Sequence, residues 1–246
     1  MELSVIIPAK NEEKNIRKTV ESVFRYLKEH DISHEIIVVT NKSTDQTVEI
    51  VKALMPEIPT LKLLDYPDKG GKGFAVKEGM LKASGQYRLF MDADNATTID
   101  HVSRMTPFLK SGFDVVIGSI RVPGYQVVAG SEPWYRVFLG RLAGIYTRVL
   151  LLPGILDSQR GFKILTAEAA RDIFSISKIT QFGFDMEMLA LAREMGYKIK
   201  EIPVRWHNDP NTASHPRLAS YFQVLLDTLR IKRDLIIGAY DKNHNG

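Results

Sequence analysis

Two aspartates separated by one small residue come directly after an apolar run, in the segment YRLFMDAD that ends at Asp94. Alternate side chains of an extended backbone point to the same side, so Asp92 and Asp94 can both face one hard divalent cation or its water ligands. A cation held there would bridge phosphate oxygens. Two aspartates after a strand also occur as a solvated turn or a helix cap. The pair therefore gains its meaning from its neighbours.

A loop of glycines and lysines, Lys69 to Gly73, precedes the aspartates by one predicted strand. It lacks the spacing of the Walker phosphate loop and of the dinucleotide-binding GxGxxG pattern. Flexible backbone amides, two cations and the start of a helix remain, and together these suit a diphosphate. If the loop acts alone, the alternative is a surface turn with solvated lysines.

Short apolar runs alternate with amphipathic segments along the chain, which predicts an α/β fold with a mostly parallel sheet flanked by helices. The expected strands are residues 3–7, 35–39, 61–64, 87–91, 114–118, 161–166 and 198–206. The expected helices are residues 12–30, 45–54, from the glycine loop to about 83, 99–109, 134–152, 184–195 and 218–237. Residues 121–133, rich in Gly, Pro and small side chains, are expected to form a long loop of functional length.

Four polar segments fall at the carboxyl ends of the first four predicted strands, namely residues 8–12, 40–45, 66–73 and 92–94. Ligands of open α/β sheets bind outside these ends, where loops approach them without competing with the strand pairing. The coincidence of the four segments favours a metal and diphosphate site over isolated turns.

Composition sets the broad limits. The chain has 246 residues, 44% hydrophobic and 25% charged, which excludes collagen-like, low-complexity and wholly disordered proteins. No stretch approaches the roughly 20 uncharged apolar residues of a membrane-spanning helix. The absence of cysteine excludes disulfides and thiol nucleophiles and fits a reducing compartment. A net charge of +4 indicates an anionic ligand or surface and no nucleic acid partner. We expect one catalytic domain, 1–210, followed by an amphipathic helix and polar tail, 211–246.

The segments VIIPAKNEE, STDQT, DKGGKGFAVKEGM, YRLFMDADNAT, DSQRGFKILT and FDMEML resemble, in order and spacing, the family 2 glycosyltransferases of the GT-A fold. The resemblance covers about residues 3 to 206. Within the family it is strongest to the dolichyl-phosphate β-glucosyltransferases and next to the dolichyl-phosphate mannose synthases. It implies an inverting enzyme, dependent on Mg²⁺ or Mn²⁺, that moves a hexose from UDP-glucose or GDP-mannose to a polyprenyl or dolichyl phosphate. Glucose is the first expectation and mannose the second.

The resemblance also implies roles for particular residues. On the donor side it assigns Pro8, Ala9 and Glu12 to the nucleoside, Lys72 to the diphosphate, and Asp92 and Asp94 to the metal of the DxD motif. On the acceptor side it assigns Arg121 and Arg136 to the acceptor phosphate, and Gln159, Arg160 and Lys163 to the DxQxGFK segment.

The chemistry of transfer agrees with these roles. Charge develops on the departing diphosphate, where a metal and Lys72 stabilise it. Arginine suits the acceptor end because its planar fork binds phosphate oxygens bidentately. A phosphate acceptor is already ionised and needs no general base, whereas a hydroxyl acceptor would need one. We expect Asp94 and Arg136 to take part in the transfer itself.

Asp185 is where the two kinds of acceptor can be distinguished. It lies at the start of the helix predicted at 184–195, where related enzymes that glycosylate hydroxyls place a base. The same position suits an acceptor-side orienting group or an ordinary helix cap. The alternative function is therefore transfer to a sugar or lipid hydroxyl with Asp185 as base. Glu187 is interpreted as a structural partner.

One departure from the family is large. Where the family has VVDDGSxD, whose first acid accepts a hydrogen bond from the nucleotide base, this chain has Thr40, Asn41 and Lys42 in place of Asp-Asp-Gly. An Asn41 carbonyl could still accept from the imide of uracil or guanine, but the donor base stays open. A further alternative is a non-catalytic subunit that binds sugar nucleotides. The presence of Lys72, Asp92 and Asp94 argues against it, because a protein without catalysis has no need for the metal site.

Contact with a membrane is implied by a polyprenyl acceptor. The segments 134–152 and 218–237 mix large apolar side chains with arginines and lysines, as interfacial helices do. Packing against the sheet is the alternative for both. We expect a peripheral protein at the cytoplasmic face of the membrane, which docks by these segments or through a separate membrane-anchoring protein.

Overall fold

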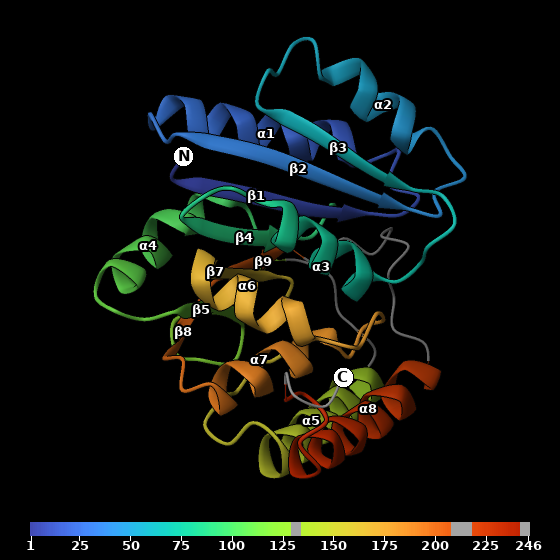
Figure 1. The fold of residues 1–246 in the computed structure, drawn as a ribbon, viewed down its shortest axis with the longest axis vertical. Helices are drawn as coiled ribbons and strands as arrows, with labels where there is room; N and C mark the ends of the chain where they lie inside the picture. The colour runs from blue at the N-terminus through green and yellow to red at the C-terminus, as the bar shows by residue number, and fades with distance from the viewer. Residues whose placement is uncertain (129–133, 208–217, 242–246) are drawn as a thin grey trace.

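A seven-stranded sheet forms the centre of the computed structural model, which describes residues 1–128, 134–207 and 218–241 (Figure 1). The strand order is β3-β2-β1-β4-β7-β5-β8, and β7 alone runs antiparallel to its neighbours, β4 and β5. The amino end of β7 therefore meets the carboxyl end of β4. The strands are β1 (Leu3–Ala9), β2 (His34–Asn41), β3 (Leu61–Tyr66), β4 (Tyr87–Met91), β5 (Val115–Ser119), β7 (Phe162–Thr166) and β8 (Ile199–Pro203).

Helices cover both faces of the sheet, which explains why β1 and β2 are almost continuously apolar. Alternate residues of β1 serve the two layers: Val5 and Ile7 pack on the face of α1, α2 and α4, whereas Ile6 packs on the face of α3, α6 and α7. The helices are α1 (Ile16–Glu29), α2 (Thr47–Leu54), α3 (Lys72–Lys82), α4 (Val102–Lys110) after the short 3₁₀ helix η1 (Ile99–His101), α6 (Ala167–Ile176) and α7 (Phe184–Glu194).

Helix α1 begins later than the sequence predicts. The apolar stripe runs from Ile16 to Leu27 on one buried face, as expected. Residues 12–15 form a turn instead of a first helical turn, because the Glu12 carboxylate accepts a hydrogen bond from the Asn15 side chain at 2.9 Å. This turn leaves the backbone N–H of Glu12 free to donate to the Thr47 hydroxyl, 2.8 Å away.

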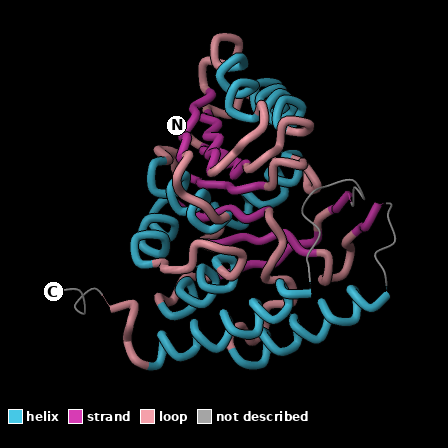
Figure 2. The backbone as a smooth tube through the Cα atoms, turned by 90° about the vertical axis from the view of Figure 1, so that its right-hand side faces the viewer, coloured by secondary structure: helices cyan, strands magenta, loops and turns pink. Residues whose placement is uncertain are grey.

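Helices α5 (Trp134–Leu150) and α8 (Leu218–Ile236) lie side by side across one end of the molecule (Figure 2). The hydroxyls of Thr147 on α5 and Thr228 on α8 are buried and lie 3.3 Å apart. Ile231 of α8 is fully buried in the core of the α3 face. None of the helices in the described parts of the chain is long and apolar enough to span a membrane. The domain division at residue 210 stays a prediction.

Two local expectations are wrong, and one helix was not predicted. The segment 121–133 is not wholly a loop, because β6 (Gln126–Val128) pairs in parallel with β9 (Arg205–His207). The strand expected at 198–206 is divided, since β8 ends at Pro203 and the residues of β9 pair with β6 instead of β5. Helix α6 was not expected; the Thr166 hydroxyl, which accepts from the N–H of Ala169, is the capping signal that indicates it.

Candidate active site

The carboxyl ends of β1, β2 and β4 and the amino end of β7 meet at one edge of the sheet. Asp92 follows β4 directly, and its backbone N–H donates to the carbonyl of Gly161 at 3.2 Å. Gly161 belongs to the segment that the sequence assigns to the acceptor side. The two halves of the predicted site therefore adjoin at the contact between Asp92 and Gly161.

Gly161 fits so closely against Asp92 that a larger residue would displace the Asp92 carboxylate. A Cβ at position 161 would fall within 3.0 Å of the Asp92 carboxylate, nearer than real Cβ contacts allow. From the other side, the Thr19 hydroxyl donates to the carbonyl of Ala93 at 2.7 Å. The residues that carry the aspartates are thus held by both α1 and β7. Sequence reasoning passed over Gly161 and Thr19; a glycine directly before a strand was the available signal for the first.

Lys72 is the first residue of α3 and faces the aspartates. Its Nζ lies 2.5 Å from Asp92 Oδ1, and the two side chains keep 23% and 31% of their surface exposed. Burial lowers the pKa of Lys72, but the charges of Asp92 and Asp185 outweigh it, so that the net shift is upward. The lysine therefore stays protonated at an accessible position at the start of a helix, where anions are favoured.

The carboxylates of Asp94 and Glu12 both lie within the influence of the charge of Asp92 at this edge. Burial raises the pKa of Asp94, and the charge of Asp92 adds to the shift. Burial likewise raises the pKa of Glu12, with Asp94 and Asp92 contributing. A bound cation would relieve this repulsion, and oxygen ligands are those that Mg²⁺ and Mn²⁺ prefer. The described residues offer no cluster of three or more metal-binding side chains, so an ion on Asp92 and Asp94 would take its other ligands from water and from substrate phosphate.

The start of α3 is docked on the backbone that precedes α7. Gly71 has a φ of +112°, and a Cβ there would collide with the Thr180 carbonyl. A Cβ at Gly73 would lie 2.7 Å from a neighbouring backbone oxygen. The side-chain amide of Asn41 donates to the Gly71 carbonyl at 2.8 Å. The glycine loop thus holds Lys72 at the sheet edge, and the hydrogen bond from Asn41 attaches this loop to the end of β2.

A second lysine–aspartate pair lies close by and is closed to solvent. Lys163 Nζ forms an ion pair with Asp185 and also donates to the Arg160 carbonyl at 2.5 Å. The side chains of Lys163 and Asp185 are 0% and 5% exposed. Burial lowers the pKa of Lys163 and raises that of Asp185, because each charge has lost its hydration, and the pairing offsets part of both shifts. The pair links the start of α7 to β7, and Lys163 also holds the segment before β7 through the Arg160 carbonyl.

On the acceptor side, Arg121 and Gln159 line one narrow hollow together with Thr147 and Asp157. The Arg121 guanidinium donates to the carbonyl of residue 140 on α5 at 3.2 Å. Gln159 Nε2 approaches a methionine sulfur of α7 at 3.8 Å. The structure therefore brings these two predicted residues together beside α5. The side chain of Arg136, on the same helix, lies outside the described residues.

Arg160 is held between two partners. Its guanidinium carbon lies 4.5 Å from the ring centroid of Trp206, and its Nε is 3.6 Å from Asp157 Oδ2. Asp157 in turn accepts from the backbone N–H of Ile120 at 3.0 Å. These contacts join the segment before β7 to the end of β5 and to β9.

Pro8 and Ala9 end β1, and Ala9 is in register with Thr40 on β2. The turn that contains Glu12 follows at once and is docked on α2 through Thr47. The three residues predicted to contact the nucleoside therefore lie together at the end of β1.

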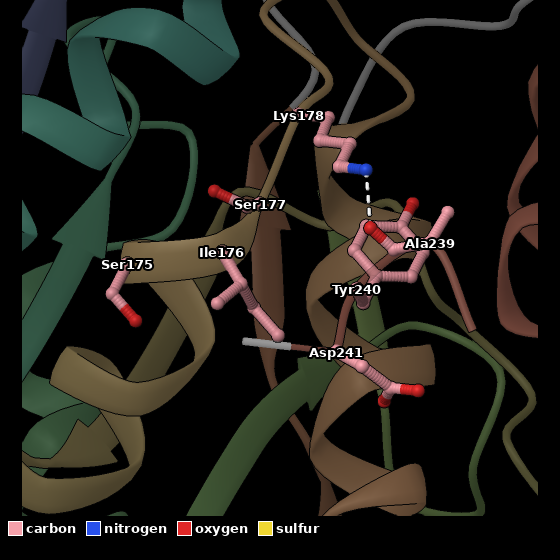
Figure 3. A pocket seen from close by; sticks show the side chains of 7 residues that line it. All are labelled: Ser175, Ile176, Ser177, Lys178, Ala239, Tyr240 and Asp241. Carbon is pink, nitrogen blue, oxygen red and sulfur yellow. Dashed lines mark hydrogen bonds between the residues drawn. The ribbon is translucent and has the colours of Figure 1, made fainter. Parts of the chain in front are cut away.

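A separate hollow of about 430 Å³ lies between the end of α6 and the end of α8 (Figure 3). It is lined by residues 175–178 and 239–241, and Lys178 reaches across it to the carbonyl of Ala239. Behind it, the buried Glu187 accepts hydrogen bonds from the Tyr240 hydroxyl and from the backbone N–H groups of Lys178 and Ile179. Glu187 thus holds together the segments that follow α6 and α8. None of the predicted site residues lines this hollow.

Comparison with known proteins identifies the fold and the class of reaction. The family model described as "Glycosyl transferase family 2" matches residues 4–174. The chain belongs to this family. It is a glycosyltransferase of the GT-A fold, as the resemblance of its segments predicts.

Among curated relatives, the dolichyl-phosphate beta-glucosyltransferase ALG5A of Trichomonas vaginalis is 32% identical over 98% of this chain and 77% of its own length. The dolichyl-phosphate beta-glucosyltransferase of Dictyostelium discoideum is 31% identical over 97% of this chain and 76% of its own.

Among solved structures, glucosyl-3-phosphoglycerate synthase from Mycobacterium tuberculosis in complex with Mn²⁺, uridine diphosphate and phosphoglyceric acid superimposes with a TM-score of 0.71. It is 20% identical and the match covers 94% of this chain and 78% of that one. The same enzyme with Mg²⁺ and uridine diphosphate gives a TM-score of 0.71 as well. These likenesses concern the fold.

Proposed function

We propose that this glycosyltransferase moves glucose from UDP-glucose to the phosphate of a dolichyl-type polyprenol, with inversion at the sugar carbon and with a divalent metal. Two relatives of about one-third identity bear the name of that activity. The observation that carries the proposal is the contact between Asp92 and Gly161, which joins the predicted diphosphate end to the predicted acceptor end. Mannose from GDP-mannose is the second candidate.

The reaction needs no general base. An acceptor phosphate oxygen forms a bond to C1 of the glucose while the bond from C1 to the diphosphate breaks, and the electron pair leaves on UDP. Lys72 lies where negative charge develops on the diphosphate. Mg²⁺ or Mn²⁺, held by Asp92 and Asp94, would neutralise the same charge when bound. Arg121 is a donor for the acceptor phosphate, and Arg136 is proposed to join it.

Asp185 fits a positioning residue in this scheme. Its carboxylate is engaged by Lys163 in a site closed to solvent, so acting as a base for a hydroxyl acceptor would require that pair to open. The hydroxyl alternative is tested by Asp185→Asn. If this variant keeps its transfer rate on a phosphate acceptor but loses transfer to a hydroxyl, the base role holds for the second reaction only.

Two helices offer a face for the membrane. Arg230, Lys232 and Arg233 of α8 accompany an exposed apolar set that includes Leu142, Ile145 and Val149 on α5 and Phe222, Leu226, Leu229 and Ile236 on α8. Such a mixture favours peripheral binding at the cytoplasmic face, directly or beside a membrane-anchoring partner. We expect the wild type to sediment with anionic vesicles, and we expect most of the double variant Phe222→Ser, Leu226→Ser to stay in the supernatant. A pellet unchanged by the variant would contradict direct docking.

The decisive assay uses purified protein with a short polyprenyl phosphate, Mg²⁺ or Mn²⁺, and a panel of labelled sugar nucleotides. We expect a lipid-linked glucose from UDP-glucose, dependent on metal. The control is Glu29→Ala, which removes an exposed carboxylate at the end of α1 and should leave turnover unchanged. Failure of every donor would overturn the proposal. Binding of UDP that is indifferent to metal and to Asp94→Ala would favour the non-catalytic subunit.

A further inference from the structure

Three neighbouring strand ends carry Ala9, Thr40 and Asp65 in one line across the sheet. Ala9 is paired with Thr40, and Thr40 with Asp65, in parallel register. Residues paired in this way point to the same face of a sheet, and adjacent strands lie about 4.8 Å apart. Asp65 is therefore roughly 10 Å from Ala9 along the edge. The line leads from the proposed nucleoside position to a carboxylate.

The Asp65 carboxylate is oriented from one side and open on the other. The Thr40 hydroxyl is fully buried and donates to Asp65 Oδ1 at 2.6 Å. Asp65 itself is exposed at the end of β3 and, within the residues that the structure describes, accepts no second hydrogen bond. One oxygen is thus fixed by the protein, and the other can accept an N–H group from a ligand.

The neighbouring residues do not offer such an acceptor. Asn41 follows Thr40 on β2 and therefore points to the opposite face, where its amide is bonded to Gly71 and it is 3% exposed. Lys42 lies along the glycine loop, with its Cδ 3.3 Å from the position of a Cβ on Gly70. The carboxylate of Asp65 is accordingly the acceptor that the ends of β2 and β3 present toward Ala9.

We propose that Asp65 is the residue that selects the base of the donor nucleotide. Its carboxylate accepts the imide N–H of uracil, or the corresponding N–H of guanine. It rejects cytosine, whose N3 carries a lone pair in place of that hydrogen, because an ionised carboxylate is an acceptor only. Thr40 is the positioning residue that aims the carboxylate. The inference rests on the proposed function, since it requires a sugar nucleotide at this edge.

The test compares two pyrimidine nucleotides of nearly the same shape. Binding of UDP and of CDP to the full chain is measured by calorimetry in Mg²⁺ for the wild type, Asp65→Asn and Asp68→Asn. We expect the wild type to prefer UDP by about 10-fold or more, because one hydrogen bond to a charged acceptor is worth about this much. In Asp65→Asn the preference should fall about 10-fold or reverse, since an amide can donate to N3 of cytosine. Asp68, an exposed carboxylate of the same segment, is the charge-matched control and should leave the ratio unchanged.

A second variant tests the aim of the carboxylate. Thr40→Val keeps the shape of the buried side chain but removes the hydrogen bond to Asp65, so the UDP preference should fall by about 3-fold to 10-fold. An unchanged ratio of UDP to CDP affinity in Asp65→Asn overturns the inference while the proposed function stands. Absence of metal-dependent UDP and GDP binding by the wild type overturns the proposed function and, with it, this inference.

Discussion

Two lysine–aspartate pairs flank Gly161, and they differ in their access to water. Lys72 and Asp92 stand at the open edge of the sheet with 23% and 31% of their side chains exposed. Lys163 and Asp185 are 0% and 5% exposed beneath the segment that carries Gly161. The open pair can exchange its partner for a phosphate or a metal. The buried pair cannot exchange its partner in this way, because the displaced charge would stay buried without hydration.

The buried pair is better understood as a means of positioning than as a source of stability. A buried ion pair loses hydration energy that its attraction only partly returns. Lys163 also holds the Arg160 carbonyl, and so places the adjacent Gly161 against Asp92. The comparison of the two pairs therefore predicts that one governs the rate and the other governs folding and geometry.

The largest effect is expected at the proposed metal site. Asp94→Ala should lower turnover about 10³-fold or more, because the charge that develops on the diphosphate loses its counter-ion. The melting temperature should not fall, since the raised pKa of Asp94 means that its charge opposes folding at neutral pH. Transfer assays and thermal unfolding check this, with Glu29→Ala as control. If Asp94→Ala has a much lower melting temperature and an unchanged transfer rate, Asp94 has a structural role and no catalytic one.

Breaking the buried pair comes next. Lys163→Met leaves Asp185 charged without a partner, and we expect the free energy of unfolding in urea to fall by about 3–5 kcal/mol. Replacing both residues, Lys163→Met with Asp185→Leu, should recover most of that loss because no unpaired charge remains. If the double variant is no more stable than Lys163→Met, the unpaired charge of Asp185 is not the cause of the lost stability.

The open pair should respond in the opposite way. Lys72→Met is expected to reduce turnover about 10²-fold, as the loss of one charge stabiliser does, while unfolding changes by less than about 1 kcal/mol for a partly solvated pair. Lys82→Met, which removes an exposed lysine from the far end of α3, is the matched control. Equal stability losses in Lys72→Met and Lys163→Met would remove the distinction between the pairs.

A third carboxylate, remote from both pairs, gives the smallest effect and a pH signature. Hydrogen bonds from Lys62, Ser4 and Ser84 overcome the effect of burial and lower the pKa of Glu35 to about 2. A depressed pKa stabilises the fold above the ordinary value of 4.5 and loses that contribution as the pH falls toward 2. Glu35→Gln should therefore cost about 1–3 kcal/mol at pH 7, and the difference from wild type should close in acid. A constant difference over this range would contradict the role of the charge.

Much of the fold follows from local pattern. Continuous apolar runs between polar turns predict the parallel strands β1, β2 and β4, and the stripe from Ile16 to Leu27 predicts α1. Less was predictable where neighbours in space decide. The division of β8 from β9 depends on β6, a partner far away in the chain. The turn before α1 is held to α2 by a bond from Glu12 to Thr47, which lies far away in the chain.

The sequence by itself determined the class of this protein as a glycosyltransferase, because its motifs follow one another in the order and spacing of that family. It placed Asp92, Asp94 and Lys72 at one edge without any knowledge of their distances. Only the tertiary structure decided what surrounds each charge. Burial separates the pair of Lys163 and Asp185 from the pair of Lys72 and Asp92, and hydration is a property of packing, which residue type and spacing do not encode.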